Sequence, residues 1–169
     1  MENFKFRKAK QTDAVKILEI RKEAILKECI HVYPEDIITK WAEIEITDSF
    51  LEDLSNDFYL VETRNQIVGT GMIDFSKSRI DAIFVSPSSM RKGVATSMLN
   101  YLEKLAREKN LNYLKLESTL NAAPFYRLHG FVGERIQIYK SPRGFHLKCI
   151  PMIKELESEY IPNVKSDFP

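Results

Sequence analysis

The chain has 169 residues, of which 44% are hydrophobic and 29% charged, as expected for one globular domain with a sizeable core. Its 25 lysine and arginine residues nearly balance its 24 aspartate and glutamate residues, which argues against nucleic-acid binding as the main function. The two cysteines, Cys29 and Cys149, belong to no cluster with metal-ligand spacing, so no metal site is expected. Sparse cysteines, with no signal-peptide pattern and no apolar run of membrane-spanning length, predict a cytoplasmic protein without a membrane partner.

The N-terminal part of the chain is predicted to hold one strand and two helices. Phe4 and Phe6 alternate with charged residues, which indicates a first strand with one buried face. A cap at Thr12 or Asp13 begins a helix with an apolar stripe. Pro34 is well placed to open a second helix. The apolar positions of this second helix, at helical spacing, are Ile37, Ile44 and the expected core anchor Trp41.

Three strands are predicted next, over residues 57–63, 66–75 and 79–85, with a tight turn between the first two. The third strand runs into a short loop that contains Gly93, and an amphipathic helix follows at once. The first turn of a helix leaves backbone N–H groups without partners and carries partial positive charge. A small residue in the loop lets a phosphate approach that backbone, so the segment predicts an anion site. An ordinary turn eased by glycine is the alternative. The buried face of the helix is predicted to hold Ala95, Met98, Leu99, Leu102 and Ala106.

The C-terminal part of the chain is predicted to add a strand, a short helix and a strand pair. Residues 112–118 alternate as a strand, and a helix over 122–129 stops at a glycine. The final strands, 131–140 and 144–152, are joined by a turn that contains proline and glycine. The polar, proline-containing segment 155–169 is predicted to be a loosely docked tail.

Two motifs in this order resemble those of the GNAT superfamily of N-acetyltransferases. The loop 90–95, which reads MRKGVA, resembles the Gln/Arg-x-x-Gly-x-Gly/Ala loop of the family, although Met90 departs from its first position. Further along, Ala122, Tyr126 and the pair Gly130–Phe131 resemble its Ala-x-x-x-Tyr and Gly-Phe segment. The resemblance is strongest over 57–155. It implies an α/β fold with a mixed, mostly antiparallel central sheet flanked by helices and a splayed central strand pair, in a single acyl-CoA N-acyltransferase domain over residues 1–169.

The resemblance implies acetyl-CoA as the co-substrate and no metal. In the family, backbone amides of the loop and the following helix turn bind the pyrophosphate, and the strand before the loop bonds to the pantetheine arm. The matching pyrophosphate-binding amides here belong to Arg91, Lys92, Gly93, Val94, Ala95 and Thr96. The matching pantetheine-binding backbone belongs to Ile83, Phe84 and Val85.

A side-chain contact to the pantetheine is also implied, but its residue is left open. The family often has an asparagine seven residues before the tyrosine, where this chain has Thr119, while Asn121 lies five residues before it. Either side chain is a candidate for the hydrogen bond. At least one of Ser118, Thr119 and Asn121 is expected to cap the short helix instead.

Tyr126 is the predicted catalytic acid, because a phenol can protonate the thiolate that leaves when an amine attacks a thioester. The family's tyrosine at this place stands beside the CoA sulfur. For the general base, some members use a glutamate on the strand before the loop, but Arg79 occupies that position here. Asp81, which two-residue spacing places on the face of Ile83, and Glu117 on the next strand are the candidates. Both carboxylates are also compatible with ordinary surface charge.

These observations predict an N-acetyltransferase in which an amine attacks the thioester directly in a ternary complex. The acceptor, a small-molecule or peptide amine, is expected to bind between the first two helices, residues 13–46, and the last strand pair. A CoA-binding sensor or regulatory module without turnover is the alternative, and Arg79 in the usual acid position favours it. Because family members are often dimers, a homodimer is also an expectation.

Overall fold

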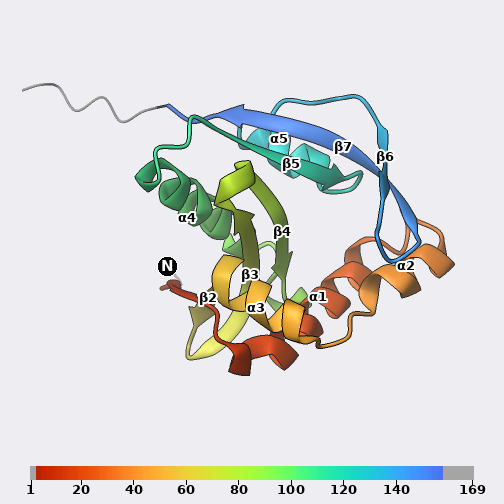
Figure 1. Ribbon diagram of the computed structural model, residues 1–169, viewed down its shortest axis with the longest axis horizontal. Helices are drawn as coiled ribbons and strands as arrows, with labels where there is room; N and C mark the ends of the chain where they lie inside the picture. The colour runs from red at the N-terminus through yellow and green to blue at the C-terminus, as the bar shows by residue number, and fades with distance from the viewer. Residues whose placement is uncertain (1–2, 158–169) are drawn as a thin grey trace, which may run out of the picture.

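The computed structural model describes residues 3–157, and its centre is a seven-stranded sheet in the order β1-β2-β3-β4-β5-β7-β6 (Figure 1). All neighbouring strands are antiparallel except β4 and β5, which are parallel. The predicted mixed, mostly antiparallel sheet is therefore confirmed. The strands are β1 Lys5–Lys8, β2 Phe58–Thr63, β3 Gln66–Asp74, β4 Arg79–Val85, β5 Tyr113–Thr119, β6 Gln137–Lys140 and β7 His146–Glu155.

Five α-helices accompany the sheet, one more than the sequence predicts. They are α1 Ala14–Glu28, α2 Glu35–Ala42, α3 Asp48–Asp57, α4 Val94–Glu108 and α5 Ala123–Leu128. Helix α3 was not expected; Thr47 caps it by accepting a hydrogen bond from the Phe50 backbone, and only Leu54 is buried, so its apolar stripe is weak. Helix α2 ends at Ala42, so Ile44 lies outside it, contrary to the prediction.

Helices cover both faces of the sheet, as strand β2 shows. Its alternate residues point to opposite sides, and each side packs against helices. Tyr59 and Val61 pack in the large core cluster that includes α4, whereas Phe58 and Leu60 pack with residues of α1 and α3. None of the helices in the described part of the chain is both long and apolar enough to span a membrane.

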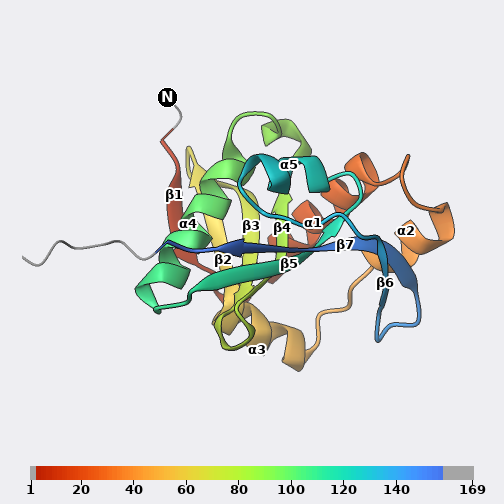
Figure 2. The same ribbon diagram turned by 90° about the horizontal axis from the view of Figure 1, so that it is seen from above.

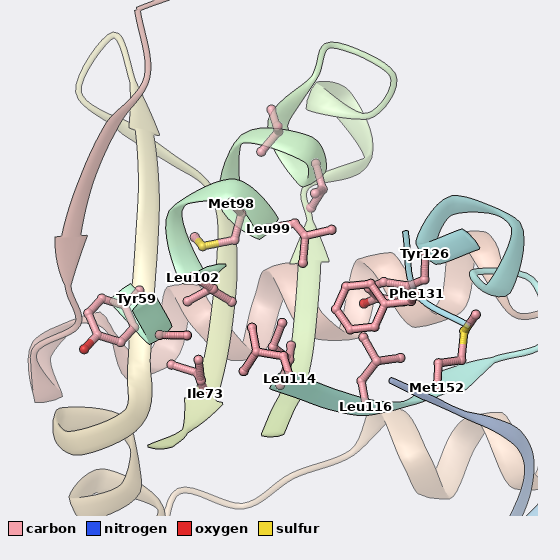
Figure 3. Close-up of a cluster of buried hydrophobic side chains, with 14 of the residues drawn as sticks. Tyr59, Ile73, Met98, Leu99, Leu102, Leu114, Leu116, Tyr126, Phe131 and Met152 are labelled. Carbon is pink, nitrogen blue, oxygen red and sulfur yellow. The ribbon is translucent and has the colours of Figure 1, made fainter. Parts of the chain in front are cut away.

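Helix α4 lies close against β3, and Figure 3 shows Met98, Leu99 and Leu102 pointing from the helix into the core. Gly71 permits this contact, because a Cβ added there would lie 2.7 Å from the sulfur of Met98. One residue of the predicted buried face is wrong: Ala95 is only half-buried, and Val94, 1% exposed, is buried in its place.

The splayed central strand pair is confirmed. Strands β4 and β5 are paired only at Arg79 and Lys115, next to a hydrogen bond of 2.9 Å from the Lys115 amide to the carbonyl of Ser78. Beyond this point the two strands separate, and Figures 1 and 2 show β5 and β7 running away from β4 at a wide angle. A bulge in β4 adds to the divergence, because the register with β3 shifts between Met72 and Ile73, leaving Asp81 as the extra residue.

The final strand pair differs from its predicted bounds. Residues 131–136 form no strand apart from a bridge between Val132 and Ile153, and β6 begins only at Gln137. At the other end, β7 continues to Glu155 and Leu156 is buried, so the chain is ordered into the start of the predicted tail. Residues 158–169 of that tail lie outside the described residues.

A buried ion-pair network on α4 generates the first prediction. Glu103 is 4% exposed, and its carboxylate lies 2.6 Å from Lys154 Nζ on β7 and 3.2 Å from Arg107 Nη2. Glu103→Ala would leave the Lys154 ammonium partly buried without its partner, and we expect the free energy of unfolding to fall by about 2–4 kcal/mol. Urea denaturation measures this loss.

Glu108→Ala is the matched control, because Glu108 lies on the same helix in an exposed pair with Lys104 at 3.8 Å. We expect this variant to lose less than about 1 kcal/mol. Equal losses in the two variants would show that the buried network does not stabilise the fold.

Candidate active site

The loop before α4 presents a row of unpartnered backbone donors. Gly93 is the N-cap of α4 with φ 82°, Arg91 also has a left-handed φ of 60°, and no side chain caps the helix. In the described part of the chain, none of the backbone N–H groups from Arg91 to Thr96 donates to a backbone carbonyl. Together with the helix dipole and the exposed Arg91 and Lys92 side chains, these amides form a site suited to an anion such as a phosphate.

A cavity of about 160 Å³ lies where β4 and β5 separate. Residues of α1, β4, β5 and the start of α5 line it. It brings together most of the predicted site residues that lie outside the loop: Asp81, Ile83, Phe84, Glu117, Thr119, Asn121 and Tyr126. Val85 does not line this cavity but is buried in the large core cluster beside α4.

A second cavity, of about 230 Å³, adjoins the first and opens toward α2 and β6. Both cavities are lined by Asp81, Glu117, Thr119 and Trp41, so the two candidate bases lie at the junction. The second cavity extends from there to side chains such as Tyr33 and Tyr139, which the first does not reach. The site therefore has two compartments that meet at a pair of carboxylates.

Tyr126 is 9% exposed and lies on α5 against two aromatic rings. Its ring centroid is 5.1 Å from that of Phe125 and 5.7 Å from that of Phe131, both in edge contacts. Figure 3 shows Tyr126 beside Phe131, with its side chain pointing away from α5 toward β4. Burial raises the pKa of the Tyr126 hydroxyl well above its usual value, so the phenol stays protonated and can donate a hydrogen bond.

Asp81 is the extra residue in the bulge of β4, so the alternation that predicted the direction of its side chain does not apply to it. Ile80 and Ile83, three positions apart, both pack in the large core cluster, so strict alternation does not hold here and two-residue spacing does not set the direction of Asp81. The Asp81 side chain is nevertheless only 21% exposed. Burial raises its pKa, although Arg79, whose Nε lies 2.5 Å from Oδ1, opposes the rise. A carboxylate with a raised pKa is a better proton acceptor.

The expected cap of α5 is wrong. The N-cap is Ala122, whose methyl side chain cannot accept a hydrogen bond, so no side chain caps the helix. Ser118 Oγ instead donates to the Thr119 carbonyl at 2.8 Å, and Asn121 Oδ1 lies 3.8 Å from the thiol of Cys29, which donates to it. Thr119 and Asn121 therefore remain turned to the cavity instead of to the helix.

Two tyrosines of the second cavity were missed by sequence reasoning. The Tyr33 hydroxyl donates to the Lys148 carbonyl at 2.7 Å and accepts from the Leu120 amide at 3.0 Å, so it links the α1–α2 connection to the ends of β5 and β7. Tyr139 comes from the edge strand β6. Neither residue has a local sequence signal, because each reaches the site only through tertiary packing.

Arg143 connects the turn between β6 and β7 to the end of α2, which carries Trp41. Its guanidinium donates to the carbonyls of Lys40 and Trp41 at 3.0 and 3.1 Å, and also to that of Glu43, at the C-terminal end of α2. Figures 1 and 2 both show β6 and α2 side by side. Within residues 3–157, no group of three or more His, Cys, Asp or Glu side chains is arranged to hold a metal.

A sheet that opens between two parallel strands, with a helix start suited to an anion following one of them, is typical of an acetyltransferase fold. Comparison with known proteins agrees: a family model described as the acetyltransferase (GNAT) domain matches residues 26–156. The chain therefore belongs to the GNAT family of N-acetyltransferases.

Individual relatives are more distant. An uncharacterized N-acetyltransferase of Escherichia coli K12, YafP, is 28% identical over 131 residues, which cover 78% of this chain and 83% of YafP. A GCN5-related N-acetyltransferase from Rhodopseudomonas palustris has a TM-score of 0.84 at 23% identity, covering 92% of this chain and 98% of that one. YncA from Salmonella typhimurium, solved with its cofactor acetyl-CoA, has a TM-score of 0.66 at 19% identity, covering 96% and 99%. At these identities the two structures support the fold.

The raised pKa of Asp81 gives a prediction about stability and pH. Because the folded-state pKa lies above the ordinary value of 3.8, the folded protein binds the proton more tightly than the unfolded chain. The contribution of Asp81 to the free energy of unfolding therefore falls as the pH rises from about 3.8 through the raised pKa of the folded state. We expect Asp81→Asn to gain stability relative to the parent between pH 4 and pH 7, measured by urea unfolding.

Asp36→Asn, on the exposed first turn of α2, is the control for the loss of one negative charge. A stability difference between the parent and Asp81→Asn that stays constant or shrinks as the pH rises would contradict the environment described for Asp81.

Proposed function

We propose that this protein transfers an acetyl group from acetyl-CoA to a primary amine. The observation that carries the proposal is the row of N–H groups from Arg91 to Thr96 that donate to no backbone carbonyl, in the segment that follows β4, the strand that separates from β5. These donors suit the pyrophosphate of acetyl-CoA, with Arg91 and Lys92 adding positive charge. A single domain would carry the whole reaction.

The opening between β4 and β5 would receive the pantetheine arm. Past Arg79, β4 has no pairing with β5, so the backbone on that edge of β4 is available to a ligand that bonds as an added strand would. Ile83 and Phe84 would contribute these backbone groups, and Thr119 or Asn121 would add a side-chain hydrogen bond. The thioester would then lie in the first cavity, close to Tyr126.

The reaction would be a direct attack in a ternary complex. The nitrogen of the amine bonds to the thioester carbonyl carbon, and the tetrahedral intermediate collapses by breaking the carbon–sulfur bond. Asp81 or Glu117, at the junction of the two cavities, would accept the proton of the amine, directly or through water. Tyr126 would give its proton to the departing thiolate and regain one from solvent. Much of the rate gain would come from holding the two reactants together.

Gly93→Val tests the pyrophosphate site. A β-branched residue strains the left-handed conformation at φ 82° and displaces the amides around it, so we expect the affinity for acetyl-CoA to fall about tenfold or more. Isothermal titration calorimetry measures the affinity. Gly144→Val is the matched control, because Gly144 has φ 81°, an equally open surrounding and a place in the β6–β7 turn. Equal losses of affinity in both variants would count against this site.

Tyr126→Phe tests the acid. We expect kcat to fall by roughly 10²–10⁴-fold with little change in the affinity for acetyl-CoA, because the ring still packs but the proton donor is gone. Tyr59→Phe is the control, since Tyr59 is also 9% exposed but lies on β2 away from the cavities. A Tyr126→Phe enzyme as fast as the parent would show that another group protonates the thiolate.

A CoA-binding module without turnover is the second candidate. The specific observation in its favour is that Arg79 pairs with Asp81 and so engages one of the two candidate bases. Such a module would bind acetyl-CoA through the same loop but release no CoA with any amine. A thiol-detection assay for CoA release over a panel of amines distinguishes the two.

A further inference from the structure

The second cavity is lined by aromatic side chains that suit one flat ring. Tyr33 and Trp41 meet in an edge contact, with ring centroids 6.1 Å apart, and Tyr139 adds a third aromatic side chain from β6. The buried Leu147, from β7, adds an apolar side chain beside these rings. The volume of about 230 Å³ exceeds the roughly 150 Å³ that suffices to hold a benzene ring in a protein interior.

The two carboxylates of this cavity, Asp81 and Glu117, lie at its inner end, where it meets the first cavity. Asp81 pairs with Arg79, whereas Glu117 has no lysine or arginine within ion-pair distance among residues 3–157. Lys148 contributes to the wall, but Leu147 and Cys149 on either side of it are buried, so by alternation its side chain points the other way. The inner end therefore favours a cation, and the outer part favours an apolar ring.

We propose that the acceptor is an arylalkylamine, a primary amine joined by a short chain to one aromatic ring. This assignment rests on the proposed acetyl transfer. The ring packs among Tyr33, Trp41 and Tyr139, and the ammonium group lies at Glu117 and Asp81, beside the thioester compartment. A carboxylate on the same skeleton would be repelled by Glu117, whose charge no lysine or arginine of residues 3–157 offsets. A second ammonium group, as in a polyamine, would lie against Leu147 and the aromatic rings without an acidic partner.

Matched amines test the assignment through CoA release in the presence of acetyl-CoA. The panel is 2-phenylethylamine, 2-cyclohexylethylamine, L-phenylalanine, spermidine and a short peptide with a free N-terminus. We expect 2-phenylethylamine to have the highest kcat/KM, with L-phenylalanine and spermidine at least about tenfold lower. The cyclohexyl analogue, which is similar in size but not flat, is expected to be about three- to tenfold lower.

Two tyrosines with nearly equal exposure provide matched variants. Tyr139 is 38% exposed and lines the cavity, whereas Tyr113 is 39% exposed and lies at the start of β5, outside it. We expect Tyr139→Leu to raise the KM for 2-phenylethylamine about three- to tenfold and to leave the KM for acetyl-CoA unchanged. Tyr113→Leu is expected to change neither value.

The outcomes separate this assignment from the proposed function. If spermidine, the peptide or L-phenylalanine is the best acceptor, or if Tyr139→Leu matches Tyr113→Leu, the arylalkylamine assignment is overturned while acetyl transfer stands. If the protein does not bind acetyl-CoA in calorimetry, the proposed function fails and the acceptor assignment falls with it. Preference for 2-phenylethylamine together with the selective effect of Tyr139→Leu supports the assignment.

Discussion

The separation of β4 from β5 after a single paired position is the constraint on which the rest of the structure depends. A continuous sheet would satisfy its backbone donors and acceptors internally and leave no space at its centre. Here the opening creates a cavity, leaves an edge of β4 unpaired and places side chains of α1, α2 and α5 around the gap. A bulge at Asp81 is part of the same departure from regular pairing, and it places a carboxylate where the opening begins.

Helix α4 holds one side of this opening in place. Its close approach to β3 depends on Gly71, and its buried side chains fix the position of its first turn relative to β4. The loop amides therefore lie directly before a helix whose position is set by core packing. The ion pair between Glu103 and Lys154 links α4 to β7 across the separated strands, so the two halves of the sheet stay connected even where they do not pair.

Much of the architecture could be predicted from the sequence, and most of the residues predicted for the site outside the Gly93 loop line one cavity. The loop around Gly93 and the tyrosine at 126 are read from short motifs, and strand alternation located most of the sheet. Helix α3 was missed because one buried leucine gives almost no periodic signal. The position of Asp81 depends on a bulge that breaks alternation, and Tyr33 and Tyr139 reach the second cavity only through tertiary packing. The second cavity is thus the part of the site that local sequence patterns describe least.

The central claim is that the loop amides and the open edge of β4 together bind acetyl-CoA, and backbone hydrogen exchange tests it most directly. Exchange followed by mass spectrometry, with and without acetyl-CoA and with ATP as the comparison, reports on both segments at once. The account predicts that acetyl-CoA slows exchange over residues 91–96 and 81–85, and that ATP has at most a weak effect on the second segment. Unchanged exchange in both segments at saturating acetyl-CoA would contradict the account.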